Sequence, residues 1–140
     1  DKVAIHYLVP VIRWIDDRQE GREKPVLYIT LDAMRDGYGK PRSNMHKTFE
    51  RLMESYDVYF VVKAPTNDHA YITESQDWIE DAISAPAYNR VIMTNRPSLL
   101  LGDFIISTDE EKGFMGTCIM LGAPEFKCWE DIETYFLRIS

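Results

Sequence analysis

The stretch Val26-Leu27-Tyr28-Ile29-Thr30-Leu31-Asp32 decides the fold. Its first six residues form a short apolar run rich in β-forming residues, which is typical of a strand buried on both faces of a sheet. Four similar runs follow, at residues 58–62, 90–94, 103–107 and 117–121. The sequence therefore predicts five short strands, the first of which ends at polar side chains.

Segments with helical spacing separate these predicted strands. One of them places Met45, Phe49 and Leu52 on a single face, and two others cover residues 73–84 and 129–137. Strands that alternate with helices favour an α/β fold in three layers, with a mainly parallel sheet flanked by helices. In such sheets ligands bind at the carboxyl ends of the strands. The residues expected to face the core from the last helix are Trp129, Ile132, Phe136 and Leu137.

The chain divides into an N-terminal helical arm, residues 1–22, and an α/β domain, residues 23–140. A helix is predicted in the arm from about Pro10 to Gln19, because apolar residues recur there with helical spacing. That apolar face needs a cover, which the rest of the chain, a second copy or another protein could supply. The residues of the apolar face are Leu8, Val11, Ile12 and Ile15.

Composition excludes several classes of protein. The 140 residues are 45% hydrophobic and 28% charged, a globular mixture that argues against a disordered chain. A net charge of −7 argues against nucleic acid or an anionic membrane as the partner. The first residues do not resemble a secretory signal, and two cysteines cannot form a disulfide framework. We expect a cytoplasmic protein.

Four segments carry a resemblance to a known family. They are Glu54–Pro65, Pro86–Thr94, Gly102–Ile106 and Trp129-Glu130. With their spacing, they resemble the 5'(3')-deoxyribonucleotidases of the haloacid dehalogenase (HAD) superfamily of phosphohydrolases. The resemblance covers roughly residues 26–140. It implies a HAD-like Rossmannoid fold, and in the family a magnesium-dependent hydrolysis through a phospho-aspartate.

The nucleophile position departs from the family pattern. The resemblance implies an aspartate nucleophile at the end of the first strand and an acid/base aspartate two residues later. Here Thr30 stands at the first position and Asp32 at the second. A threonine hydroxyl is almost wholly protonated at neutral pH and needs a neighbouring base to attack. Thr30 and Asp32 are therefore interpreted as vestigial, with no intact set of catalytic residues.

The other chemical positions depart as well. Lys63 replaces the hydroxyl residue that the resemblance implies after the second strand, and Ser107 and Thr108 replace the acidic pair expected to help hold magnesium. The expected lysine before the fourth strand is absent, although Arg96 lies nearby. No metal site is expected. Instead we expect Lys63 to pair with Asp32 and to replace the charge of the metal.

The candidates for binding a phosphate or another ligand all lie at or after the ends of predicted strands. The acidic run at residues 109–111 is expected to be a solvated loop, since consecutive residues rarely converge on one ion. About 25 residues separate Asp32 from the second strand, which leaves a minimal cap that hardly closes a site. The candidate ligand-binding residues are Asp32, Lys63, Asn67, Arg96, Ser107 and Thr108.

Three hypotheses about function follow. The first is a deoxyribonucleotidase homologue that has lost phosphatase activity and binds a protein, a nucleotide or phosphate without turnover and without a cofactor. The second is an active magnesium-dependent phosphohydrolase of (deoxy)nucleoside monophosphates, working through Asp32 or Asp36. The third is a structural module in which the arm mediates a homodimer or binds a protein partner.

Overall fold

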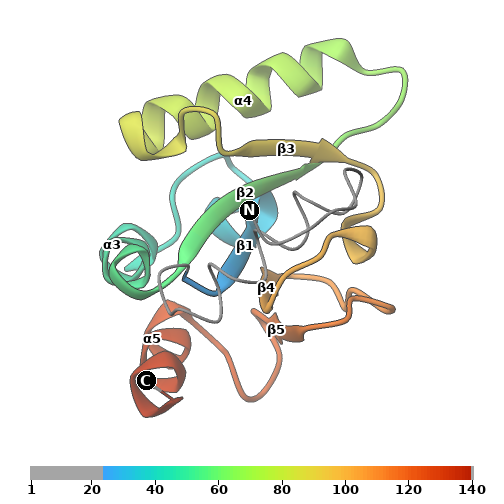
Figure 1. Ribbon diagram of the computed structural model, residues 1–140. Helices are drawn as coiled ribbons and strands as arrows, with labels where there is room; N and C mark the ends of the chain where they lie inside the picture. Colours follow the sequence, from blue (N-terminus) through green and yellow to red (C-terminus); the bar gives the residue numbers. More distant parts are fainter. Residues whose placement is uncertain (1–23, 140) are drawn as a thin grey trace, which may run out of the picture.

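Five parallel strands form the centre of the computed structural model, which describes residues 24–139. Their order across the sheet is β3-β2-β1-β4-β5 (Figure 1). Each strand begins and ends within one residue of its predicted bounds. The predicted α/β fold with a parallel sheet flanked by helices is confirmed. The strands are β1 (Val26–Thr30), β2 (Asp57–Lys63), β3 (Val91–Thr94), β4 (Phe104–Ser107) and β5 (Thr117–Met120).

Helices and short 3-10 turns connect the strands. The fourth helix begins four residues before its predicted start at residue 73, because the Asp68 side chain caps it by accepting a hydrogen bond from the Tyr71 N–H at 3.0 Å. The elements are α2 (Leu31–Met34), α3 (Met45–Ser55), α4 (His69–Ile83), η2 (Ala85–Ala87), η3 (Pro97–Leu99) and α5 (Trp129–Ile139).

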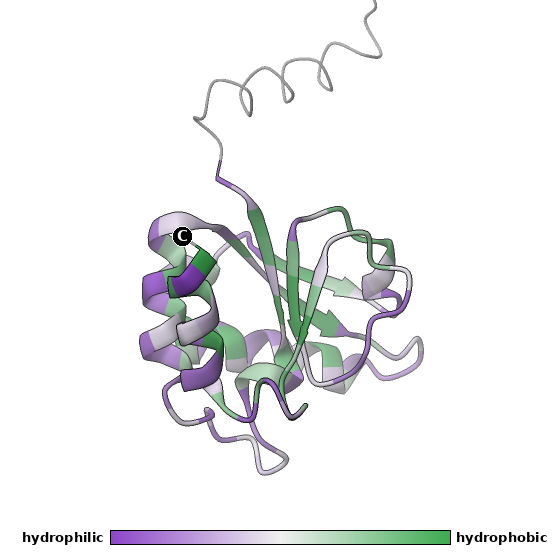
Figure 2. Cartoon of the chain, turned by 90° about the horizontal axis from the view of Figure 1, so that it is seen from below, coloured by the Kyte–Doolittle hydropathy of each residue, from purple (hydrophilic) through white to green (hydrophobic). Residues whose placement is uncertain are grey.

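The larger hydrophobic cluster lies between the sheet and three helices. α3, α4 and α5 all contribute buried side chains to it, and Figure 2 shows the strands as mainly hydrophobic. Trp129, Ile132 and Phe136 are buried as expected, but Leu137 is 59% exposed, so its predicted burial is wrong. The helix turns about 100° per residue, which carries Leu137 away from the sheet when Phe136 faces it.

A smaller cluster lies on the other face of the sheet, where Tyr28, Val61, Ile105 and Phe114 are buried together. Side chains alternate between the faces along a strand, so the residue two positions after each of these strand residues points to the same face. The carboxyl-terminal residues of β1, β2 and β4 therefore share the face of the smaller cluster. They are Thr30, Lys63 and Ser107.

The loops before and after β4 lie against each other. A Cβ atom on Gly116 would be 2.5 Å from the carbonyl oxygen of Asp103 and 2.6 Å from that of Gly102, so only glycine fits there. The close approach brings together two loops with exposed apolar side chains. The exposed apolar side chains are those of Leu99, Leu101 and Met115, which are 68%, 81% and 85% exposed.

The helix predicted in the N-terminal arm lies outside the described residues. Over residues 24–139, none of the helices combines the length and the hydrophobicity that a membrane span requires.

Candidate functional site

The carboxyl edge of the sheet brings three neighbouring strands together. β1 lies between β2 and β4, and Thr30 is in register with Val61 of β2. On its other side, Ile29 is in register with Ile106, which places Thr30 level with Ser107. The sequence-predicted positions on these three strands thus meet at one edge, on one face.

Lys63 is the centre of a polar network at this edge. Its Nζ lies 2.9 Å from Asp109 Oδ2 and 2.6 Å from Glu111 Oε2. The Ser107 hydroxyl donates a hydrogen bond to the same Glu111 oxygen at 2.9 Å and accepts one from the Asp109 N–H at 3.1 Å. The network therefore links the end of β2 to the loop after β4.

Partial burial and charge act in opposite directions on Lys63. Desolvation lowers the pKa of Lys63, but hydrogen bonds and charge attraction from Glu111 and Asp109 outweigh it and raise that pKa above its ordinary value. The Glu111 side chain is only 7% exposed, whereas that of Asp109 is 64% exposed. The buried half of the network is the pair between Lys63 and Glu111, and the ammonium group is its positive charge.

The network corrects two expectations. Among the described ion pairs, Lys63 binds Asp109 and Glu111 instead of the predicted Asp32. The acidic run is not only a solvated loop, because two residues separated by one position converge on a single ammonium ion. Sequence reasoning missed Glu111. The signal that could have found it is a lysine at the end of an apolar strand, since a part-buried charge requires a counter-charge.

Thr30 and Asp32 differ sharply in exposure. Thr30 is 3% exposed, and its Oγ1 has no hydrogen-bond partner in the described part of the chain. Asp32 is exposed in the first turn of α2, and its backbone carbonyl accepts a hydrogen bond from Arg42 Nε at 3.0 Å. A hydroxyl at this depth with no base bonded to it is not activated for attack.

The other candidates lie on separate loops. Asn67 is exposed on the loop before α4, and Arg96 is exposed before η3, with its N–H bonded to the Thr94 hydroxyl at 3.0 Å. Thr108 is half-buried directly after β4. Among the described hydrogen bonds, these three residues take no part in the network around Lys63.

A short loop occupies the place where the resemblance implies a cap. Asp36 Oδ1 accepts hydrogen bonds from the N–H groups of Lys40 and Tyr38, at 3.0 and 2.8 Å. These bonds, first that of Lys40 and then that of Tyr38, lower the pKa of Asp36. The Asp36 carboxylate therefore stabilises the turn through these backbone hydrogen bonds, as in many Asx turns.

This loop is fastened to α4. Arg35 forms a two-fold hydrogen-bonded ion pair with Glu74, with N–O distances of 2.6 and 3.0 Å, and its guanidinium lies 5.4 Å from the centre of the Trp78 ring. The Trp78 Nε1–H donates to the carbonyl of Gly39 at 2.8 Å. The loop is thereby held beside α4.

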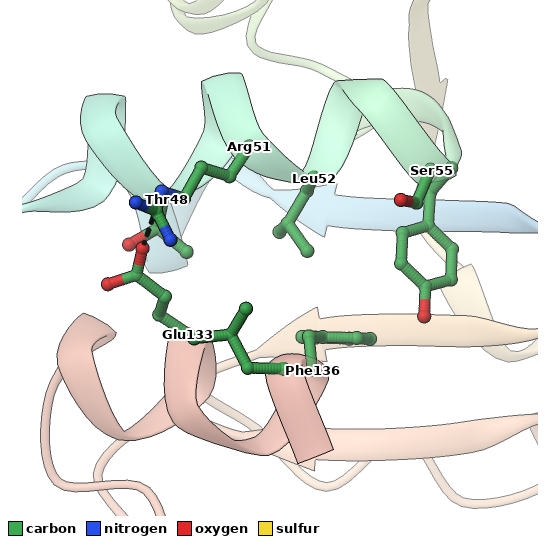
Figure 3. A pocket seen from close by; sticks show the side chains of 8 residues that line it. Thr48, Arg51, Leu52, Ser55, Glu133 and Phe136 are labelled. Atoms are coloured by element: carbon green, nitrogen blue, oxygen red, sulfur yellow. Dashed lines mark ion pairs between the residues drawn. The ribbon is translucent and has the colours of Figure 1, made fainter. Parts of the chain in front are cut away.

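Two of the hollows in the described part of the chain border α5. An open one of about 290 Å³ at the start of α5 is lined by Arg42 and Lys127 and by the acids Asp36 and Glu130, so its formal charges cancel. A cavity of about 60 Å³ between α3 and α5 is bordered by an ion pair between Arg51 and Glu133 (Figure 3). Ligand pockets commonly measure roughly 300–1,000 Å³, so the second cavity has room for a few water molecules only.

Magnesium does not fit the side chains at the carboxyl edge. The ion prefers hard, anionic oxygen ligands, but Asp109 and Glu111 are already bonded to the Lys63 ammonium group. Over residues 24–139, no group of three or more His, Cys, Asp or Glu side chains is arranged to hold a metal ion.

The chain is similar to a phage protein. A comparison with curated proteins finds one from Vibrio phage KVP40, named "Putative 5'(3')-deoxyribonucleotidase", that is 28% identical over 127 residues. The match covers 87% of this chain and 70% of the phage protein. No family model matches the chain. The similarity supports a relationship to a nucleotidase-like family.

Proposed function

We propose that this chain is a HAD-like homologue of the 5'(3')-deoxyribonucleotidases that has lost phosphatase activity and acts by binding a protein partner. The observation that carries the proposal is Thr30. It stands at the position that the resemblance assigns to the nucleophile, it is 3% exposed, and its hydroxyl has no hydrogen-bond partner among the described residues. Covalent catalysis would need a nucleophile with an activating base.

The charge of the carboxyl edge favours a protein over a phosphate ligand. Lys63 is the cation of the network, and two carboxylates already share it. Asp32 adds a third negative charge to the edge. A phosphate group would be repelled by these acids, because phosphate sites are built from unshared cations and N–H donors.

Exposed apolar side chains support an interaction role. Leu99, Leu101 and Met115 extend from two loops that the close approach at Gly116 holds together. Exposed apolar side chains that gather on one surface are typical of protein interaction sites. The arm, with its predicted apolar face, is the proposed second contact, and a homodimer is the partner we test below.

A phosphate-release assay tests the proposal directly. The wild-type protein is incubated with deoxynucleoside monophosphates and with an aryl phosphate, with and without magnesium, beside an Asp32→Asn variant purified in parallel. We expect no release above the level of Asp32→Asn, because neither preparation has a usable nucleophile. Sustained turnover that Asp32→Asn abolishes would show an active phosphohydrolase and overturn the proposal.

A melting-temperature assay separates protein binding from nucleotide binding. We expect no rise in melting temperature with deoxynucleoside monophosphates or inorganic phosphate, since a ligand that binds only the folded state would raise it. A concentration-dependent rise without turnover would instead support the nucleotide-binding form of the hypothesis and contradict the preference for a protein.

A further inference from the structure

The ion pair of Lys63 crosses over the end of β1. Lys63 closes β2, and Asp109 and Glu111 follow β4, while β1 lies between these two strands. The ammonium and carboxylate groups that meet at 2.6 and 2.9 Å therefore span the edge above the carboxyl end of the central strand. Thr30, at that end, is almost fully buried.

Burial makes the ammonium group necessary to this edge. Glu111 Oε2 receives both the Lys63 ammonium and the Ser107 hydroxyl, and Ser107 is 1% exposed. A carboxylate that is nearly excluded from water is strongly destabilising unless a positive charge compensates it. Of the two groups bonded to the Glu111 oxygen, only Lys63 carries that charge.

We propose that the Lys63 ammonium is a built-in cation that takes the place of a divalent metal at the carboxyl edge. The edge then holds its two carboxylates together without taking up magnesium, and removal of the lysine turns Asp109 and Glu111 into a divalent-cation site. Magnesium commonly binds through one or two carboxylates and keeps several waters. Asp109 supplies a solvent-facing carboxylate, and Glu111 supplies the buried one.

The inference does not depend on loss of phosphatase activity. A metal-independent hydrolase would overturn the proposed function but leave the built-in cation in place. Conversely, an inactive protein that bound magnesium at this edge would retain the proposed function and lose the inference. The two proposals therefore fail on different measurements.

The test compares wild type, Lys63→Met and Lys63→Arg by isothermal titration with MgCl2 and by thermal melting with and without that salt. Methionine keeps the length and apolar stem of the lysine and removes its charge. We expect no magnesium heat and no magnesium-dependent melting shift for wild type and Lys63→Arg. Lys63→Met should melt several degrees lower and recover part of that loss in MgCl2 but not in NaCl of equal ionic strength.

A double variant assigns the effect to the buried carboxylate. Lys63→Met combined with Glu111→Gln removes both charges, so we expect higher stability than in Lys63→Met alone and no response to magnesium. If Lys63→Met folds only in MgCl2 while the double variant folds without it, the inference is supported. Magnesium binding by the wild type that Asp109→Asn abolishes would overturn it, as would a folded Lys63→Met variant that ignores magnesium.

Discussion

The hydroxyl group of Thr30 is buried and has no hydrogen-bond partner among the described residues. An unpaired buried hydroxyl costs roughly 1–3 kcal/mol, and valine has nearly the same shape without that group. Thr30→Val should therefore raise the free energy of unfolding by about 1 kcal/mol. The melting temperature should rise by about 3 °C for a domain of this size. Chemical denaturation monitored by circular dichroism measures the first quantity.

Two variants control this prediction. Thr30→Ser keeps the hydroxyl and removes a methyl group, so it should lower stability by about 1 kcal/mol. Thr94→Val makes the same change at the end of β3, where the hydroxyl accepts the Arg96 N–H at 3.0 Å, and should also be destabilising. A Thr30→Val variant less stable than wild type would mean that this hydroxyl has a partner.

The positions of the candidate site residues were more predictable than the contacts between them. The sequence places Thr30, Lys63 and Ser107 at the ends of strands, and parallel pairing then forces them to one edge. The partner of Lys63 was not predictable, because it depends on the path of the loop after β4. That loop folds back to bury Glu111, and neither residue spacing nor hydrophobic pattern records such a path.

At the scale of elements, the strands were predictable because burial on both faces leaves an uninterrupted apolar run. The helix starts were less predictable. The first turn of α4 contributes none of the buried residues of that helix, and it depends on a capping bond from Asp68, which periodicity does not detect. The contact between α4 and the loop around Asp36 was not predictable either, since Arg35 and Glu74, which form it, are 39 residues apart in the sequence.

The contact between α4 and the loop around Asp36 should weaken in acid. The hydrogen bond and charge of Arg35 lower the pKa of Glu74 below its ordinary value of 4.5, so the folded state holds this carboxylate ionised more firmly than the unfolded state. The stabilisation is present above the ordinary value and is lost as the pH falls through the lowered one. We expect the Trp78 indole N–H resonance to shift over that acid range, as the ion pair between Arg35 and Glu74 breaks.

Glu74→Gln is the matched control for this titration. It removes the charge and keeps the shape, so its Trp78 resonance should resemble the acid form already at neutral pH and should not titrate in this range. Trp78→Phe assigns the resonance by its disappearance. An identical titration in wild type and Glu74→Gln would assign the acid response to another group.

At the scale of the whole molecule, the three long helices cover the larger cluster, whereas the most exposed aliphatic side chains lie on the loops around β4. α3, α4 and α5 all bury side chains in the larger cluster, whereas the smaller cluster is completed by Phe114 and by half-buried residues from the strands and loops. The exposed Leu101 and Met115 belong to the loops on either side of β4. The net charge of −7 thus coexists with exposed apolar area that could contact a second chain.

The arm offers the apolar residues for that contact. Leu8, Val11, Ile12 and Ile15 recur with the spacing of one helical face, and we expect them to join two copies of the chain. Ile12→Glu places a charge in that face and should slow sedimentation to the monomer value, whereas Arg13→Glu on the opposite face should leave the dimer intact. Leu101→Glu tests whether the surface beside β4 is part of the same interface, because it should then act like Ile12→Glu. Ile12→Glu with unchanged sedimentation but a lower melting temperature would mean that the arm packs within its own chain, which contradicts the homodimer.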